Sequence, residues 1–181
     1  ANPNYVNAFY HKGLALVQLE RYGEAIAAFD RAAEIDPTHT LAFYHRGLTL
    51  VRLNRLPEAV MAFDSVLAIS PQNTNALYEK ALALFYLLHY QEPVTAFEEA
   101  LEQNPALIDG WLHMGIGLAH IGRPEDAIAA FDQALTANPG YANAIFQKGR
   151  AYLALHNPDG AIRAFDRALE INPSCYQAHY W

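Results

Sequence analysis

The stretch that decides the fold is residues 111–139, which read WLHMGIGLAHIGRPEDAIAAFDQALTANP. It contains a small residue, Gly115, then a phenylalanine, Phe131, and it closes on Pro139. Shifting the stretch by 34 residues in either direction returns the same pattern, without insertion or deletion. The phenylalanine position is filled by Phe29, Phe63, Phe97, Phe131 and Phe165. A fixed period of this length is the signature of a repeat protein, so the sequence predicts an array of equivalent units.

Two further positions recur with the same period. The glycine position holds Gly13, Gly47, Ala81, Gly115 and Gly149. The proline position holds Pro3, Pro37, Pro71, Pro105, Pro139 and Pro173. Proline cannot continue a helix, so each proline is expected to mark the end of a helical segment. Gly47 and Ala59 are expected where the two helices of a repeat cross, because a larger side chain there would overpack the crossing, at a cost of about 1–3 kcal/mol.

Each repeat is expected to contain two helices joined by a turn. Between Ala25 and Ile35, apolar residues recur at the spacing of one helix face. Glu24 precedes them, in the first turn, where the helix dipole favours a negative charge. The pattern predicts helices over residues 7–19, 23–35, 41–53 and 57–69, and helix pairs within 109–137 and 143–171. The predicted fold class is therefore all-α.

The third copy departs from the pattern. Ala81 replaces the glycine, Leu77 stands in the position of Trp111, and Pro93 takes a position that is usually alanine. We expect Pro93 in the first turn of its helix, where proline is tolerated. Two interpretations stay open for this copy: sequence drift without consequence, or a local change of superhelical curvature.

With these residues the chain resembles the tetratricopeptide repeat (TPR) family across residues 3–181. The resemblance implies an α-solenoid of five helix-turn-helix repeats in a right-handed superhelix with a concave groove. The repeats are then residues 6–39, 40–73, 74–107, 108–141 and 142–175 of a single array. Residues 1–5 would be the end of a preceding repeat and residues 176–181 the start of a truncated sixth, so we expect a fragment of a larger protein.

Composition limits the classes of partner. Of the 181 residues, 52% are hydrophobic, which suits helices that bury two faces, and the net charge is −7. An acidic surface without basic stripes disfavours nucleic acid and anionic membrane surfaces. No apolar run approaches the roughly 20 residues of a membrane span. Cys175 is the only cysteine, so no intrachain disulfide can form and we expect a reducing, cytoplasmic location.

In the family, one face of each repeat's first helix makes the inner wall of the groove. The corresponding positions in the first copy are Asn7, Tyr10, Leu14, Val17 and Gln18, which step by three and four residues and so share a face. The candidate partner-binding residues taken from these positions are Asn7, Tyr10, Leu14, Tyr44, Leu48, Asn75, Tyr78, Leu82, Phe85, Leu112, Asn143, Phe146 and Arg150. This surface is expected to bind a protein or peptide ligand with apolar side chains, since tyrosine offers a large contact area and a polar hydroxyl. The alternative is that some of these side chains pack between neighbouring first helices.

Two ligand-binding patterns known in the family are missing. The clamp that holds a C-terminal carboxylate in chaperone-binding members falls on Tyr10, Leu14, Leu48, Tyr78 and Leu82, and none of these matches it. Threaded from the third copy, the clamp is matched at Arg150 alone. The asparagine ladder of glycosyltransferase-attached arrays falls on His11, His45, Glu79, His113 and Gln147.

Neither a metal site nor a catalytic site is expected. Equivalent histidines on neighbouring helices would lie about 8–10 Å apart, whereas zinc needs each nitrogen at roughly 2.0–2.1 Å. We therefore interpret His11, His45 and His113 as hydrated residues at the groove edge. Cys175 and His179 lie four residues apart, but no third group is evident to activate the thiol, so Cys175 is interpreted as an exposed loop cysteine. No cofactor-binding motif is present, and the prediction is a non-enzymatic protein.

The first hypothesis is therefore a protein-protein interaction scaffold that binds a partner segment in its concave groove. An alternative is a self-assembling structural module, because Ile162, Phe165 and Leu169 of the last repeat lack a full following repeat to cover them. Homo-oligomers would then form through the exposed terminal repeats. A further alternative is the recruiting arm of a larger multidomain enzyme.

Overall fold

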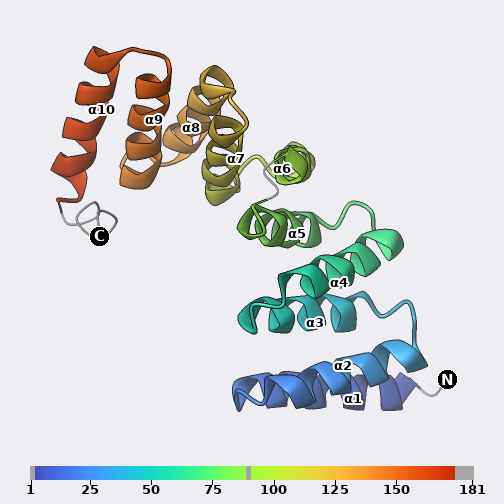
Figure 1. The fold of residues 1–181 in the computed structure, drawn as a ribbon. Coiled ribbons are helices and arrows are strands. Elements are labelled where there is room, and N and C mark those ends of the chain that lie inside the picture. Colours follow the sequence, from blue (N-terminus) through green and yellow to red (C-terminus); the bar gives the residue numbers. More distant parts are fainter. Residues whose placement is uncertain (1–2, 89–90, 174–181) are drawn as a thin grey trace. The chain divides into compact units, whose positions relative to one another are not determined.

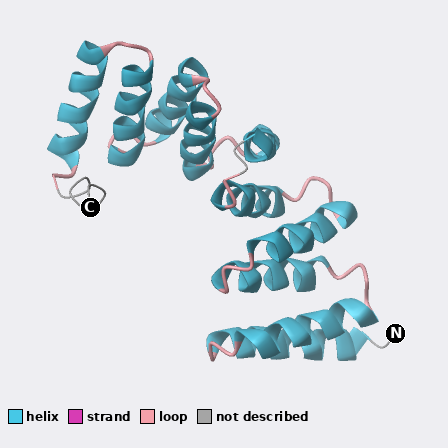
Figure 2. Cartoon of the chain, viewed as in Figure 1, coloured by secondary structure: helices cyan, strands magenta, loops and turns pink. Residues whose placement is uncertain are grey.

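The computed structural model describes residues 3–88 and 91–173, with side chains from residue 5 onward. Cys175, His179 and the expected start of a sixth repeat lie outside the described residues. Within the described ranges the chain forms helices and no strand, joined by short loops (Figures 1 and 2). The helices are α1 (Pro3–Gln18), α2 (Tyr22–Ile35), α3 (Thr40–Arg52), α4 (Leu56–Ile69), α5 (Thr74–Tyr86), α6 (Gln91–Gln103), α7 (Ile108–His120), α8 (Pro124–Ala137), α9 (Ala142–Ala154) and α10 (Pro158–Ile171).

The chain divides into two compact units, Ala1–His89 and Tyr90–Trp181. We call α1, α3, α5, α7 and α9 the A helices and the even-numbered helices the B helices. In the first unit each helix packs on the next, from α1 to α5, and α3 also contacts both α1 and α5. In the second unit the same holds from α6 to α10, and α7 contacts α9. Each unit is therefore a stack of helices, and the expected all-α solenoid of hairpins is confirmed.

Helices α2, α3 and α4 begin one residue before the predicted positions, whereas α1 begins at Pro3 and not at residue 7. Pro3 is therefore the first residue of a helix, whereas the proline pattern led us to expect it at the end of one. Proline is accepted at the first helical position, where its missing amide donor costs nothing. Pro93 lies in the first turn of α6, as expected, and is fully buried.

On four of the A helices, α1, α3, α7 and α9, a glycine packs against the phenylalanine of its own repeat; α5 has Ala81 at this position. A Cβ built on Gly13 would lie 2.4 Å from Phe29 Cε1, and one on Gly47 would lie 2.6 Å from Phe63 Cε1. The corresponding distance is 2.5 Å for Gly115 with Phe131 and 2.6 Å for Gly149 with Phe165. The expected close approach at the glycine is therefore confirmed, and the group that requires the glycine is the phenylalanine ring.

The turn from each A helix to its B helix also repeats exactly in register. One residue there adopts a positive φ, between 55° and 78°, at Glu20, Asn54, Leu88, Gly122 and His156. This left-handed conformation ends the A helix. An ion pair then spans the start of several B helices: Arg21 with Glu24, Arg55 with Glu58, and Arg123 with Asp126.

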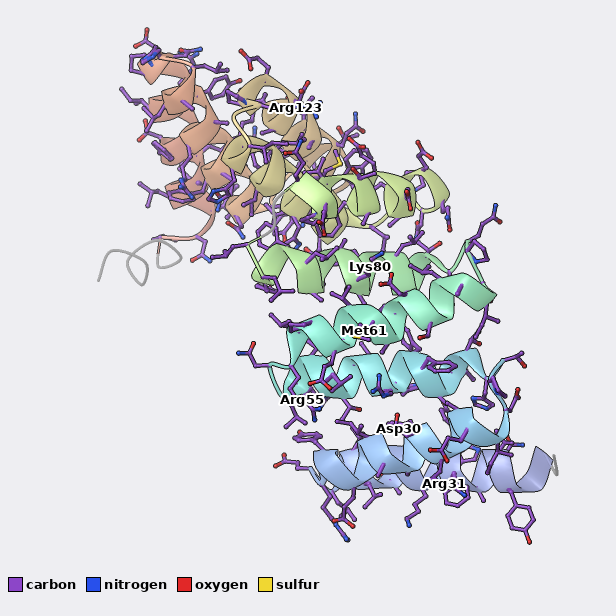
Figure 3. The ribbon with its side chains drawn as sticks, turned by 45° about the vertical axis from the view of Figure 1, so that its right-hand side comes forward. Asp30, Arg31, Arg55, Met61, Lys80 and Arg123 are labelled. Atoms are coloured by element: carbon purple, nitrogen blue, oxygen red, sulfur yellow. The ribbon has the colours of Figure 1, made fainter. Side chains whose placement is uncertain are left out.

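Ion pairs join the B helix of one repeat to the A helix of the next. Lys80 Nζ lies 2.6 Å from Asp64 Oδ1, and Lys148 Nζ lies 2.5 Å from Asp132 Oδ1. Arg46 Nε lies 2.7 Å from Asp30 Oδ1, an ion pair without the alignment of a hydrogen bond. Figure 3 labels Asp30 on α2 and Lys80 on α5. Partly exposed pairs contribute about 0–1 kcal/mol, so these pairs add little to the stability of the fold.

Candidate ligand-binding wall of the A helices

Each unit contains A-helix positions that the sequence predicts to face a ligand. In the first unit α3 lies against α1 and α5, so residues at equivalent positions of these three helices form rows. In the second unit the rows run from α7 to α9. We call these rows the A-helix wall. It is described for each unit separately.

The predicted wall residues differ in how much surface they offer. Eight are half-buried: Leu14, Tyr44, Leu48, Tyr78, Leu82, Phe85, Asn143 and Phe146. Three are exposed: Asn7, Asn75 and Arg150. Tyr10 and Leu112 are buried, which leaves a ligand almost nothing to contact at these two positions.

Tyr10 is buried because the next repeat covers it. Its ring centroid lies 5.2 Å from that of His39 and 5.6 Å from that of His45, while Phe29 lies below it at 6.1 Å. Only 9% of Tyr10 remains exposed, and burial raises the pKa of its hydroxyl. Tyr10 is therefore part of the core between the first two repeats.

The half-buried wall residues have one side on the core and one side open. The ring of Tyr44 lies 5.9 Å from that of Phe63, and Leu48 packs against the same core cluster. Burial, followed by the nearby charge of Glu79, raises the pKa of Tyr44. In the second unit the ring of Phe146 lies 5.4 Å from that of Phe165. These side chains support the core and also present apolar surface.

Three exposed apolar residues of the wall were missed as candidates. Tyr86 is 59% exposed, and Leu41 and Leu153 are also exposed. They occupy the wall positions equivalent to Gln18, Asn7 and Val17. The 34-residue period places them on the wall, but it does not show that their neighbours leave them uncovered. Tyr86 lies edge-on to Phe85, with ring centroids 5.7 Å apart.

A pocket of about 150 Å³ opens on the wall of the second unit. Its apolar lining comes from Ile116 and three alanines, and its polar lining from His120, Gln147 and Arg150. Arg150 Nη1 donates to Gln147 Oε1 over 3.2 Å, which orients the guanidinium beside the pocket. Sites for small molecules usually have volumes of about 300–1,000 Å³. A pocket of this size is better suited to a single side chain of a larger ligand.

The interpretation of the histidines as hydrated groove-edge residues is wrong for two of them. The ring of His45 stacks on Phe29 at 6.1 Å, and the ring of His113 stacks on Phe97 at 6.0 Å. Burial lowers the pKa of both imidazoles, although a hydrogen bond between His113 Nδ1 and the carbonyl oxygen of Asp109 acts in the opposite direction. His11 of the first repeat is exposed.

The described residues include no group of three or more His, Cys, Asp or Glu side chains that could hold a metal ion. Among the helices of residues 3–88 and 91–173, none has the length and apolar character needed to cross a bilayer.

The repeated hairpins, their glycine–phenylalanine crossings and the A-helix wall define a helical repeat protein with a surface suited to protein interaction. Sequence models described as tetratricopeptide repeat match residues 1–40, 10–74 and 78–142, and another of the same description matches residues 118–181. The chain belongs to the tetratricopeptide repeat family. Membership in this family supports a role as a protein-interaction scaffold.

Solved structures with the same fold have low sequence identity to this chain. A crystal structure of MamA protein has a TM-score of 0.91 at 21% identity, covering 98% of this chain and 96% of that one. YrrB, described as a TPR protein with an unusual peptide-binding site, has a TM-score of 0.88 at 24% identity, covering 96% of this chain and 90% of that one. These similarities concern the fold. Among curated proteins none matches this sequence.

Proposed function

We propose that this chain is a non-enzymatic scaffold whose A-helix wall binds an extended or helical protein segment with apolar side chains. The observation that carries the proposal is exposed apolar surface on the wall of each unit: Leu41 and Tyr86 lie with the half-open ring of Tyr44 in the first unit, and Leu153 lies with that of Phe146 in the second. Exposed apolar residues gathered on one face indicate an interaction site. A peptide-binding site in YrrB, a protein of the same fold, supports a peptide as the ligand.

Polar groups on the wall supply the contacts that an extended ligand backbone requires. Asn75 is exposed and Asn143 is half-buried, and each side-chain amide can both donate to and accept from a peptide group. The pocket beside Arg150 and His120 would accept one ligand side chain. Cys175 is the only cysteine of the 181 residues and can form no disulfide within them, which supports our proposal of a reducing, cytoplasmic location.

The test uses a library of random linear peptides displayed on phage and selected on the 181-residue chain. Selected peptides are expected to be rich in apolar residues and to lose binding to a Leu41→Asp/Tyr86→Asp variant. Both substituted residues are exposed, so the variant should keep its helical circular dichroism and melting temperature.

The matched control is Met61→Asp, which changes an equally exposed apolar residue on the B helix α4 (Figure 3). Selected peptides should bind this control as they bind the parent chain. The proposal would be refuted if the selected peptides bound the Leu41→Asp/Tyr86→Asp variant normally but did not bind Met61→Asp. The binding site would then lie on the B helices.

A further inference from the structure

The pocket on the wall of the second unit has a charge that suits one kind of ligand side chain. It lies between α7 and α9, which contact each other, so the structure describes both of its sides. Two of its polar residues, His120 and Arg150, can carry a positive charge, and the third, Gln147, is neutral. None of the described residues that line it is Asp or Glu. The pocket is therefore locally positive in a chain whose net charge is −7.

The guanidinium of Arg150 is not neutralised within the chain. No described Asp or Glu forms an ion pair with it, and the residues outside the described ranges include no Asp or Glu. Lys148 of the same helix, by contrast, pairs with Asp132. Arg150 donates to Gln147, which is uncharged, and a guanidinium has further N–H donors. Its charge is therefore left for an anion from outside the chain.

The carboxylate closest in sequence to the pocket is held away from it. Asp109 is the only acid in α7 and α9, two helices that the structure describes in full. It lies in the first turn of α7, roughly 16 Å along the helix from His120, and it accepts a hydrogen bond from the hydroxyl of Tyr141. The partial negative charge at the end of α7 is met by His120 in its last turn. Arg150 lies one turn before the end of α9, where this helix-end effect has faded.

The charge of Arg150 is particular to the fifth repeat. The equivalent positions of the other repeats are aliphatic: Leu14, Leu48, Leu82 and Ile116. Phe146, which is half-buried, lies one turn before Arg150 on the same face of α9. An apolar ligand side chain can thus pack on Phe146 next to a charged one at Arg150.

We propose that this pocket binds the carboxylate of an aspartate or glutamate side chain within the partner segment. The inference rests on the proposed peptide-binding function of the A-helix wall. Arg150 forms the ion pair, for which a guanidinium can offer two parallel hydrogen bonds to a carboxylate. Gln147 orients the guanidinium. Because a volume of about 150 Å³ suits one side chain, the pocket is assigned to a side chain and not to the C-terminus of the partner.

The first experiment compares selections of phage-displayed random peptides on the parent chain and on Arg150→Gln. Peptides fused to the coat protein through their C-terminus have no free terminal carboxylate, so a requirement for acid comes from a side chain. Peptides selected on the parent chain are expected to be enriched in Asp or Glu next to apolar residues, and those selected on Arg150→Gln are not. Apolar peptides without this enrichment would overturn the inference and leave the proposed function in place. A selection that yields no peptide would refute both.

The second experiment measures the ion pair by titration calorimetry. The probe is the peptide selected most often on the parent chain, synthesised with an amidated C-terminus, with each acid in turn kept or replaced by its amide. Replacing the acid that enters the pocket should weaken binding to the parent chain roughly tenfold, since hydrogen bonds between charged groups are strong. The same replacement should not change binding to Arg150→Gln. Equal losses in both proteins for every acid would overturn the proposal.

The same peptide with a free C-terminus tests the assignment to a side chain. It should bind the parent chain no more tightly than the amidated form. A gain from the free C-terminus that disappears in Arg150→Gln would assign the pocket to a terminal carboxylate and overturn the proposal.

Arg163→Gln is the matched control, because Arg163 is an exposed arginine on the B helix α10 of the same unit. It removes the same charge as Arg150→Gln and should keep the preference for an acidic peptide. Both arginines are exposed, so both variants should keep the helical circular dichroism and melting temperature of the parent chain. If Arg163→Gln abolished the preference as fully as Arg150→Gln does, net charge and not the pocket would explain it, and the proposal would fail.

Discussion

The two faces of an A helix differ in how much they vary between repeats. On the buried face, Gly13, Gly47, Gly115 and Gly149 each meet a phenylalanine ring in almost the same way, with a built Cβ 2.4–2.6 Å from the ring. On the A-helix wall, the position of Leu14 becomes Ile116 and then Arg150, and that of Gln18 becomes Tyr86 and then His120. The constant face sets where the helices lie. The variable face contributes less to this placement, because most of its side chains are half-buried or exposed.

The largest expected effect is the removal of a ring from the constant face. Phe63→Ala should lower the free energy of unfolding by about 3–5 kcal/mol, because Phe63 is completely buried and the ring leaves a cavity beside Gly47. Urea unfolding followed by circular dichroism measures this change. A loss below about 1 kcal/mol would mean that the ring does not hold the hairpin together.

Filling the glycine crossing should have the next largest effect. Gly115→Val should cost about 1–3 kcal/mol, because a built Cβ already lies 2.5 Å from Phe131 Cε1. Gly23→Val is the matched control, since a Cβ on Gly23 meets no atom within 4 Å. If both substitutions cost the same, helix propensity and not the crossing would explain the glycine.

Acid should weaken the junctions between repeats. Burial lowers the pKa of His45 and His113, so these groups bind protons more weakly in the folded chain than in the unfolded chain. Their contribution is therefore complete above the unfolded pKa of about 6.5, and stability falls as the pH drops below it.

Unfolding measured between neutral and mildly acidic pH should show this loss, and His45→Gln should reduce it. A pH dependence that is the same in His45→Gln and in the parent chain would contradict the stacked placement of His45.

The smallest effect on stability is expected on the wall. Tyr86→Ala should change the free energy of unfolding by less than about 0.5 kcal/mol, because the side chain is mostly exposed. Tyr44→Ala should cost more, since its ring rests on Phe63 at 5.9 Å. Both substitutions should weaken the binding of a selected peptide by about tenfold or more, as measured by titration calorimetry. If Tyr86→Ala and Tyr44→Ala lowered the free energy of unfolding equally, Tyr44 would not support the core more than Tyr86 does.

Much of the fold follows from the 34-residue period, and much of the wall does not. The period predicts the helices and, for α2 to α4, their starts to within one residue. It predicts a glycine at the crossing, but not that a phenylalanine ring is the neighbour that requires it. The position of α1 was predicted poorly, because Pro3 begins this helix whereas the equivalent prolines lie in loops.

The exposure of wall residues depends on side chains from the neighbouring repeat, which a period cannot supply. Tyr10 and Tyr44 hold equivalent positions, yet Tyr10 is covered by His39 and His45 and Tyr44 is not so enclosed. Asn73 and Glu79 stand at the matching places next to Tyr44, where they provide no aromatic cover. Exposure of this kind is a property of pairs of repeats, so the single-repeat pattern misses Tyr86 and Leu153.

The most direct test of the account is the location of a bound peptide on the isotope-labelled chain. Two-dimensional NMR spectra are recorded while a selected peptide is added. The account predicts that the signals that shift belong to the A helices, with the largest changes around Leu41, Tyr44 and Tyr86. Shifts confined to the B helices around Met61 would contradict it.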